Sequence, residues 1–569
     1  MRRRSELAAM AATCSSLYAV VIPTLYSRFE YAWPTKFTRT MRPARVDALV
    51  QCLSTLAMGE DVFQGEPAFY QSGSCPRCGE GGHQRFIAPP PTNVKRQVRR
   101  GNYFARYTRS FFIENHFALK SKFDVIHSEG KMLNALVSLA VARMVNLESF
   151  VWDMPTGVSR DVWIALGSLA NLQDHECRLE RVWVRWHHNM GNYVTAVSIL
   201  TQEILPFPIS FSTPNLPFAT KQQMRLEWGP VEYPTFSVLP PLKSLSVLQI
   251  DEPSYVVEMA VLINRSRDRL RELRVGLDLR TLNLTWTKPA RRGLSDINRP
   301  PGWPKYSGIL GVLFRAFRGS SKWGSSRCAG PRPPKIPISQ QGPGLSQSGV
   351  VPLTTVEKTP KGPRKFSDAS SFSEVGSRST LQLDVLELEN IHLSVSILSK
   401  VVDWTKLTTL TILRCETSDE LWETLQQQFA PPMAPFTVDS THHYPLKLRS
   451  IRVDTVTDPF LSFIDHTLAP DTLESVSLHE WYPTDMQIDD FFWRVIGRHQ
   501  RTLKRVLVDV AESHVAQSNW QKWVLTRDII SSITDGQMTQ LRELSISLNA
   551  SDWVSFQIFP SLRRANMSW

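Results

Sequence analysis

The sequence has few cysteines, and they are not arranged as a disulfide framework. Seven cysteines are scattered through 569 residues, and only Cys75 and Cys78 lie close together. An odd, scattered set of cysteines indicates reduced thiols, which is typical of a cytoplasmic or nuclear protein.

Long apolar runs are also missing. The most apolar stretch, residues 132–147, is interrupted by polar residues. A membrane span needs about 20 apolar residues, so we expect none. Residues 2–4 are arginines that precede an apolar run, as in a targeting peptide, but Glu6 and several hydroxyl residues interrupt that run. We therefore favour a chain without a targeting peptide.

Motifs that carry chemistry are absent as well. The sequence contains no nucleophile elbow, no phosphate-binding glycine loop and no paired helical histidines. Its two histidine pairs, His187-His188 and His442-His443, are adjacent in sequence. On a strand, adjacent side chains point to opposite faces. The sequence thus indicates a protein that is not an enzyme and has no cofactor.

One cluster has the composition of a metal site. Cys75 and Cys78 form a CxxC motif, and His83 follows in the same Gly-rich segment. A structural zinc site needs four ligands, and this segment supplies three. We interpret it as a loop with free thiols. The alternative is a zinc ion held by Cys75, Cys78, His83 and a distant fourth ligand.

The positive charge is confined to one segment. The chain has a net charge of +12. Residues 286–380 contain 16 Lys/Arg and 4 Asp/Glu, which leaves +12 there and about zero elsewhere. This segment also holds 12 prolines and a serine-rich stretch. Such a composition cannot bury enough apolar area, so we expect a disordered insertion in which only residues 308–317 form a transient helix. A retained intron would have a similar composition.

A second basic stretch suggests an alternative partner. Residues 95–112, KRQVRRGNYFARYTRSFF, interleave cations and aromatics. Bases of single-stranded nucleic acid stack on such side chains. Because the rest of the chain is nearly neutral, we favour a linker whose aromatics pack on the first repeat. A nucleic-acid binder remains an alternative, and strong salt dependence of binding would support it.

A short phrase recurs along the chain: Leu, two variable residues, an aliphatic residue, one variable residue and a second aliphatic residue. It starts at Leu179, Leu270, Leu448, Leu473, Leu503 and Leu541, with looser copies at Leu147, Leu245, Leu383, Leu407 and Leu562. Each of the first six copies carries a charge directly after the first Leu, and the starts at 448, 473 and 503 lie 25 and 30 residues apart. Leucine-rich repeats have periods of about 20–29 residues.

The phrase predicts short strands separated by helices. Its two aliphatic residues lie on one face of a strand, and helical stripes fall between copies, at 255–270, 458–468 and 489–496. We predict an α/β leucine-rich-repeat solenoid over 131–285 and 381–569, with parallel strands on the concave side and helices outside. The residues predicted to be buried are Val182, Val184, Leu273, Val275, Ile451, Val453, Leu544 and Ile546. The alternative is an ordinary α/β domain with coincidental periodicity.

Residues between and beside the buried aliphatics should line the concave face, which is the usual binding surface of a solenoid. The predicted substrate-binding residues are Trp183, Arg185, Arg274, Arg452, Asp454, His479 and Glu543. Trp183 with Arg185 is the first choice of anchor, because Trp and Arg are frequent hot spots. The alternative is that Trp183 packs against a neighbouring strand or against residues 95–112.

The N-terminal residues, ELAAMAATCSSLYAVVIPTLYSRFEYAWP from Glu6, carry a family resemblance. Apolar residues recur there at helical spacing, Pro23 is expected to break the helix, and Phe29 is expected to continue it. This pattern resembles the second half of an F-box, and the exit segment is similar to that of fungal F-box/leucine-rich-repeat proteins. Phrases at 141–158 and 239–251 are similar to the same family.

The resemblance implies a substrate receptor of an SCF-type ubiquitin ligase, in which residues 1–34 dock on a Skp-family adaptor, 35–130 are a linker and the repeats bind a protein substrate. The adaptor-binding residues would be Leu7, Met10, Cys14, Leu17, Leu25 and Tyr26. The usual Leu-Pro-x-Glu opening of the first half is missing, so we expect weak docking or none. The alternative is a leucine-rich-repeat scaffold without a ligase link.

Overall fold

The structure is a computed structural model. It describes residues 4–33, 42–59, 101–115, 127–153, 158–172, 176–185, 234–281, 286–287, 308–318, 380–431, 443–480, 486–510, 520–546 and 564–566. Met1–Phe317 and Thr380–Trp569 form one compact unit, and Arg318–Ser379 form a second, nearly all of which lies outside the described residues. The fold described below is that of the first unit.

The described strands form a single sheet of thirteen, all parallel and in chain order. They are β1 Arg28–Trp33, β2 Ser110–Asn115, β3 Ser149–Trp152, β4 Arg181–Arg185, β5 Ser244–Ile250, β6 Glu272–Leu277, β7 Val385–Glu389, β8 Thr409–Leu413, β9 Ser450–Val453, β10 Ser475–Glu480, β11 Arg505–Val510, β12 Glu543–Ser545 and β13 Arg564–Asn566. Parallel neighbours require a crossover between consecutive strands. The order runs from β1 to β13 without a reversal, so the prediction of stacked parallel strands is confirmed.

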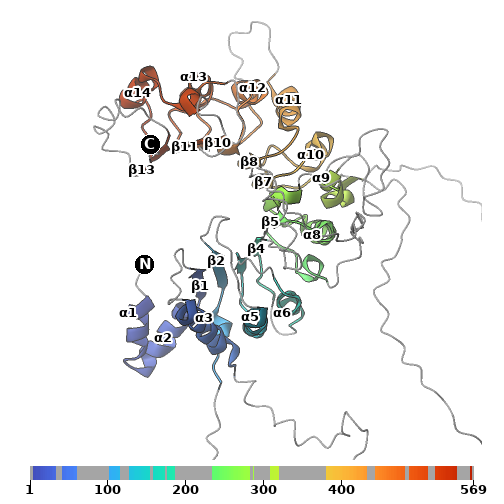
Figure 1. The fold of residues 1–569 in the computed structure, drawn as a ribbon, viewed down its shortest axis with the longest axis vertical. Helices are drawn as coiled ribbons and strands as arrows, with labels where there is room; N and C mark the ends of the chain where they lie inside the picture. The colour runs from blue at the N-terminus through green and yellow to red at the C-terminus, as the bar shows by residue number, and fades with distance from the viewer. Residues whose placement is uncertain are drawn as a thin grey trace, which may run out of the picture. The chain divides into compact units, whose positions relative to one another are not determined.

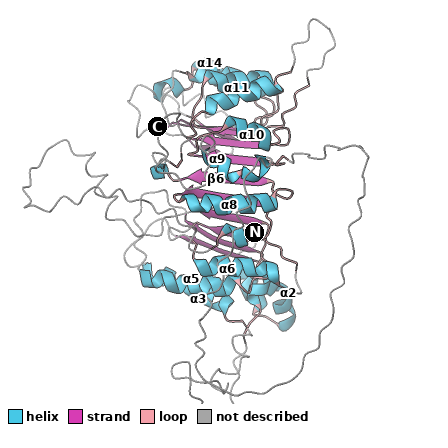
Figure 2. Ribbon diagram, turned by 90° about the vertical axis from the view of Figure 1, so that its right-hand side faces the viewer, coloured by secondary structure: helices cyan, strands magenta, loops and turns pink. Residues whose placement is uncertain are grey.

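Helices follow one another along one face of this sheet, with the strands on the inner side (Figures 1 and 2). They are α1 Arg4–Ala11, α2 Ser15–Leu25, α3 Arg42–Ala57, α5 His127–Val141, α6 Arg160–Ser168, α8 Pro253–Ser266, α9 Gly308–Leu313, α10 Val395–Val401, α11 Ser418–Phe429, α12 Asp458–Thr467, α13 Ile488–Phe491 and α14 Arg527–Thr534. Short helical turns are Phe104–Tyr107, Leu169–Asn171, Phe236–Val238, Leu279–Thr281, Arg315–Arg318, Phe492–Ile496, Gly497–His499 and Trp520–Trp523. The three helical stripes read from the sequence correspond to α8, α12 and α13 with its π-helical extension.

The recurring phrase holds the same position in each repeat. Its eight aliphatics predicted to be buried are at most 3% exposed, so that prediction is confirmed. One copy was misaligned: Arg181 of β4 pairs with Ser244 of β5. The phrase of β5 therefore starts at Leu242, three residues before the predicted start at Leu245. A second leucine, Leu245 at the fourth position of the phrase, made both alignments fit the pattern.

The sheet begins earlier than the sequence predicted. Strands β1 and β2 precede the first phrase, and they pair with each other and with β3. Their register places Tyr26 and Thr108 where later copies have Leu, while Phe111 and Ile113 of β2 are fully buried. The boundaries 1–34, 35–130 and 131–285 are therefore wrong, because the supposed F-box exit and linker supply strands and α3.

Two details of the N-terminal prediction also differ. Pro23 lies inside the last turn of α2 and does not break the helix, although a proline there removes one backbone N–H donor. Phe29 lies on β1 and not on a helix. Its ring stacks on Phe111 at 4.9 Å, and Phe111 stacks on Phe150 at 5.5 Å. These aromatic contacts join the first three strands through their helix-facing sides.

The charge that follows the first Leu of the phrase forms ion pairs between neighbouring repeats. Lys243 lies 2.6 Å from Glu180. Glu474 lies 2.6 Å from Lys504 and 3.4 Å from Arg449. The side-chain hydrogen bond from Lys504 lowers the pKa of the Glu474 carboxyl. Each exposed pair contributes about 0–1 kcal/mol, so these charges add more to strand register than to stability.

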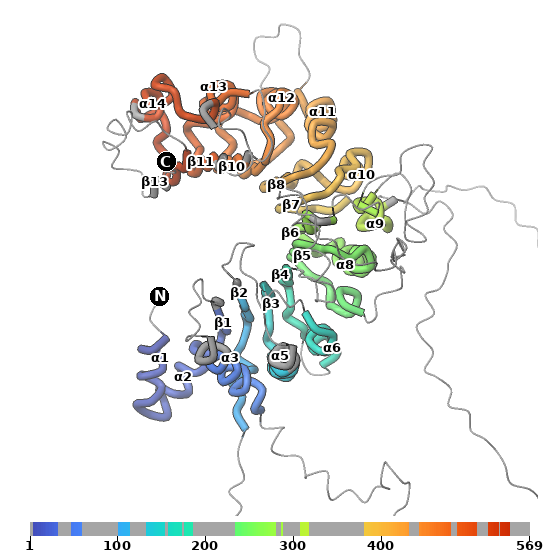
Figure 3. Tube along the Cα trace, viewed as in Figure 1, coloured from blue at the N-terminus to red at the C-terminus, as the bar shows by residue number. Residues whose placement is uncertain are grey.

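The expectation that residues 286–380 form a disordered insertion is wrong for two described parts. Trp286 is 2% exposed, and Leu310 and Phe314 are fully buried in the main core. Helix α9 packs between α8 and α10 (Figure 3). It is the crossover helix between β6 and β7, which the parallel sheet requires there. The rest of that prediction falls on residues that lie outside the described ones.

Candidate functional site: the open face of the sheet

Alternate residues of each strand point away from the helices. In β4, Val182 and Val184 are fully buried, whereas Trp183 and Arg185 between and beside them are partly exposed. In β9, Arg452 is exposed between the buried Ile451 and Val453. The described helices lie along the other face of the sheet (Figure 1). The alternate side chains define the open face of the sheet.

Two grooves lie on the open face. The first, which we call the tryptophan groove, spans β2 to β6 and has a volume of about 310 Å³. It is lined by Phe112, Val151, Asp153, Arg181, Trp183, Arg185, Ser244, Ser246, Glu272 and Arg274. The register places Trp183 between Val151 and Ser246. Three of the predicted binding residues, Trp183, Arg185 and Arg274, therefore meet in one place.

The arginines of the tryptophan groove are paired with carboxylates. Arg185 lies 3.3 Å from Asp153, and its guanidinium lies over the Trp183 ring at 5.5 Å. Arg274 lies 3.7 Å from Glu387. Burial raises the pKa of the Glu387 carboxyl, and Arg274 opposes that shift. The groove thus presents an aromatic surface within a charge-balanced rim, which suits a partner's apolar or aromatic side chain.

The second groove, which we call the serine groove, spans β8 to β12 and has a volume of about 570 Å³. It is lined by Thr411, Ser450, Arg452, Ser475, Ser477, His479, Arg505, Leu507, Glu543, Leu544 and Ser545. The predicted binding residues Arg452, His479 and Glu543 meet here. The sequence prediction missed the hydroxyls, although small polar residues recur at the alternate positions of these strands.

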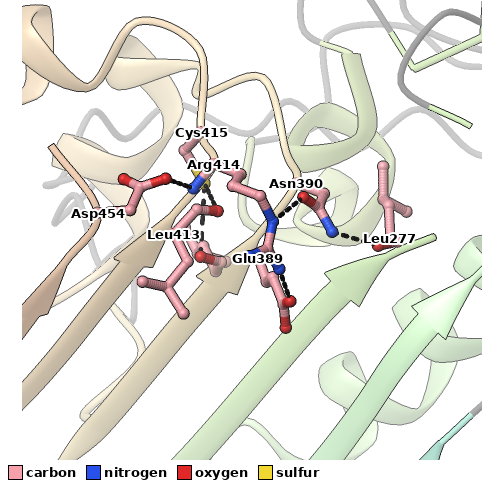
Figure 4. A network of polar contacts seen from close by, with 8 residues as sticks. Leu277, Glu389, Asn390, Leu413, Arg414, Cys415 and Asp454 are labelled. Atoms are coloured by element: carbon pink, nitrogen blue, oxygen red, sulfur yellow. Dashed lines mark hydrogen bonds and ion pairs between the residues drawn. The ribbon is translucent and has the colours of Figure 1, made fainter. Parts of the chain in front are cut away.

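Asp454 does not belong to the exposed surface, so its assignment as a substrate-binding residue is wrong. It follows β9, is 6% exposed and accepts a hydrogen bond from the backbone N–H of Arg414. The Arg414 guanidinium donates to Asn390 Oδ1 at 2.7 Å and to Glu389, and Asn390 donates to the Leu277 carbonyl at 2.7 Å (Figure 4). This network joins β6, β7, β8 and β9.

Two further titratable groups, Cys415 and His499, have pKa values shifted by desolvation. Burial raises the pKa of the Cys415 thiol to about 12, which makes it a poor nucleophile. Burial lowers the pKa of His499 to about 4, and its Nδ1 accepts a hydrogen bond from the Thr472 N–H at 3.2 Å. Neither group lines a groove. Both pKa shifts are explained by the packing of these side chains inside the fold.

The adaptor candidates lie at the N-terminal end. Cys14 caps α2 by accepting from the Leu17 N–H, and Leu7 and Met10 are partly exposed on α1. Tyr26 stacks on Phe104 at 4.2 Å and packs against the main core, and Leu25 lines a small pocket beside it. The most exposed apolar side chains of α2 are Leu17, Tyr18 and Val20, at 39%, 45% and 71%.

The described part of the basic-aromatic stretch packs mainly within the fold. Phe111 is buried, Phe104 contacts Tyr26, and Phe112 lies under the Arg28 guanidinium at 4.9 Å. Tyr103 and Tyr107 remain exposed. These contacts agree with the preferred interpretation of aromatics that pack on the first repeats.

The candidate metal cluster, Cys75, Cys78 and His83, lies outside the described residues. Among those that are described, no three His, Cys, Asp or Glu side chains come together as a metal site. Within the same residues, every helix is too short or too polar to cross a membrane. No protein-family model matches the sequence, and no curated protein matches it significantly. Function is therefore argued from the two grooves and the N-terminal helices.

Proposed function

We propose that this protein is a leucine-rich-repeat receptor that binds a protein partner on its open face and performs no chemistry itself. The observation that carries the proposal is an all-parallel sheet whose described helices lie on one face and whose other face has two grooves. Stacked repeats present such a face as an extended binding surface. An aromatic residue, Trp183, lies in one groove beside Arg185, and both are residue types typical of interface hot spots.

We further propose that α1 and α2 dock weakly on a Skp-family adaptor, which makes the protein the substrate-recognition subunit of an SCF-type ligase in the cytoplasm or nucleus. The two helices pack on each other, and no residue of α1 is buried. Exposed apolar side chains on α2 would be covered by the adaptor. Holding a substrate near a ubiquitin-transferring enzyme raises its effective concentration without new chemistry.

Val20→Asp is expected to weaken binding of a purified Skp-family adaptor about tenfold or more, because an aspartate would lose its hydration in an apolar interface. Val20 is 71% exposed, so the fold should tolerate the change. Binding is measured by calorimetry with the full chain. Ile164→Asp on α6, where Ile164 is 49% exposed, is the control and should bind normally. If the unmodified chain does not bind the adaptor, the scaffold alternative without a ligase link replaces this part of the proposal.

Trp183→Ala is expected to weaken partner binding by about 2 kcal/mol or more, as loss of an interface hot spot does. Arg274→Ala should weaken binding in the same groove. The unfolding midpoint of Trp183→Ala should hardly change, because Trp183 is only partly buried. Trp152→Ala is the contrasting variant: Trp152 is fully buried, and its loss should cost about 3–5 kcal/mol of stability. Destabilisation by Trp183→Ala as large as that of Trp152→Ala would place Trp183 in the core and remove this site.

A further inference from the structure

The serine groove contains polar side chains that the fold leaves without partners. Within the described residues, Arg452 makes no hydrogen bond or ion pair, and neither do the hydroxyls around it. These hydroxyls belong to Thr411, Ser450, Ser475, Ser477 and Ser545. Unpaired donors and acceptors gathered in one groove are available to a ligand.

The register brings these side chains together. Arg452 of β9 lies between Thr411 of β8 and Ser477 of β10. On the next row Ser475 lies between Ser450 and Arg505. Neighbouring parallel strands are about 4.8 Å apart. A group held by the Arg452 guanidinium is therefore within reach of hydroxyls on both adjacent strands.

Arg452 differs from the other described arginines that line the two grooves, because it forms no ion pair with a described carboxylate. Arg185 and Arg274 on the open face pair with Asp153 and Glu387. Arg505, the other arginine of the serine groove, lies 2.5 Å from Glu543. Among the described arginines that line the two grooves, Arg452 alone forms no ion pair, and it acts on Glu387 only through space. The serine groove thus carries about one uncompensated positive charge.

We propose that the serine groove binds an acidic side chain, Asp or Glu, on an extended segment of the partner protein. One carboxylate matches one free guanidinium, which binds it with two parallel hydrogen bonds. The hydroxyl rows offer donors and acceptors to the segment's backbone, and Leu507 offers an apolar contact beside them. This inference rests on the proposed function, since it assigns the chemistry of one part of the open face.

The test is selection of random decapeptides displayed on phage against the full chain. The selected peptides should be enriched in Asp or Glu at one position. A synthetic fluorescein-labelled peptide from the selection should bind the Arg452→Ala variant about 10- to 100-fold more weakly, as expected for a lost hydrogen bond to a charged group. Its Asp→Asn or Glu→Gln form should bind the unmodified chain with a similar loss. Arg267→Ala is the control, because Arg267 is also an exposed arginine but follows α8 and lines neither groove.

Three results would overturn the inference. The first is selection of peptides without acidic residues, and the second is equal binding of a selected peptide to Arg452→Ala and to the unmodified chain. Displacement of the peptide by millimolar sodium phosphate, but not by sodium acetate at the same ionic strength, would instead assign the groove to a phosphate group. Each of these results would remove the acidic-ligand inference. If Trp183→Ala also abolished peptide binding, the proposed function as a protein receptor would still be supported. Binding unaffected by changes in either groove would contradict the proposed function itself.

Discussion

Replacing Phe314 by alanine is expected to lower the free energy of unfolding by about 3–5 kcal/mol, the usual cost of removing a buried Phe side chain. Phe314 is fully buried and belongs to the main core. It directly follows α9, which packs on α8 and α10. In a stacked array each repeat is stabilised by its neighbours, so a cavity here weakens contacts on both sides. Urea denaturation followed by circular dichroism measures the change.

Leu279→Ala provides the control for this variant. Leu279 lies in the same connection between β6 and β7 but is 39% exposed. Its loss should change stability by less than about 0.5 kcal/mol. If both variants unfold at the same urea concentration, α9 does not pack and the whole connection behaves as the insertion that its composition predicts. A large difference supports α9 as the crossover helix.

The sequence predicted the repeats where a leucine starts the phrase and missed them where another residue does. From β3 onward every strand carries a recognised copy, although that of β5 was misaligned by three residues. Strands β1 and β2 have Tyr26 and Thr108 at that position. The tyrosine fills the space by stacking on Phe104. The threonine side chain donates a hydrogen bond to the Tyr26 carbonyl. Both residues make the contacts that this position needs, but neither is the leucine by which the phrase is recognised in the sequence.

Helix α9 was predicted only as a transient helix, and for a different reason. Its apolar residues span 308–317, and prolines and basic residues surround them. Composition averaged over the longer segment indicates disorder, whereas the parallel sheet requires one crossover between each pair of strands. A count of helices against strands would have placed a helix between β6 and β7. The chain between these strands is long, and α9 at Gly308–Leu313 occupies only a short part of it.

The candidate site was predicted in part. Alternation along the strands placed Trp183, Arg274, Arg452 and His479 correctly on the open face, because β-strand side chains alternate. The alternation does not predict which of these arginines form ion pairs, because their carboxylate partners lie on neighbouring strands. For Asp454 the alternation was extended one residue beyond β9. There the chain leaves the sheet, and the carboxylate turns to a backbone N–H.

Replacing Arg414 by alanine is expected to lower the free energy of unfolding by about 2–4 kcal/mol, because it removes one partner from a largely buried polar network. The side chains of Arg414 and Glu389 are 11% and 21% exposed, and Asn390 is 2% exposed. Without the guanidinium, the Glu389 carboxylate loses its ion pair and Asn390 Oδ1 loses a donor. Chemical denaturation at neutral pH measures the loss.

Arg452→Ala is the matched control, since it makes the same substitution on the strand next to β8. Arg452 is exposed and makes no ion pair within the described residues. Its loss should change stability by less than about 0.5 kcal/mol. The two variants should thus separate stability from binding: Arg414→Ala unfolds the sheet more readily, and Arg452→Ala affects the ligand. Equal stability of the two would show that the network in Figure 4 does not hold these strands together.

Asp454→Asn separates the network from the binding surface. The amide oxygen of asparagine still accepts the Arg414 N–H, so stability at neutral pH should be kept or slightly raised. Burial raises the pKa of the Asp454 carboxyl above its unfolded value. The folded state therefore binds a proton more tightly than the unfolded state, and this group destabilises the fold as the pH rises through that range. Asp454→Asn removes this pH dependence of stability. Asp454→Ala leaves the Arg414 N–H without an acceptor and should lower the free energy of unfolding by about 1–3 kcal/mol. Loss of peptide binding in a stably folded Asp454→Asn variant would show that Asp454 takes part in ligand binding after all.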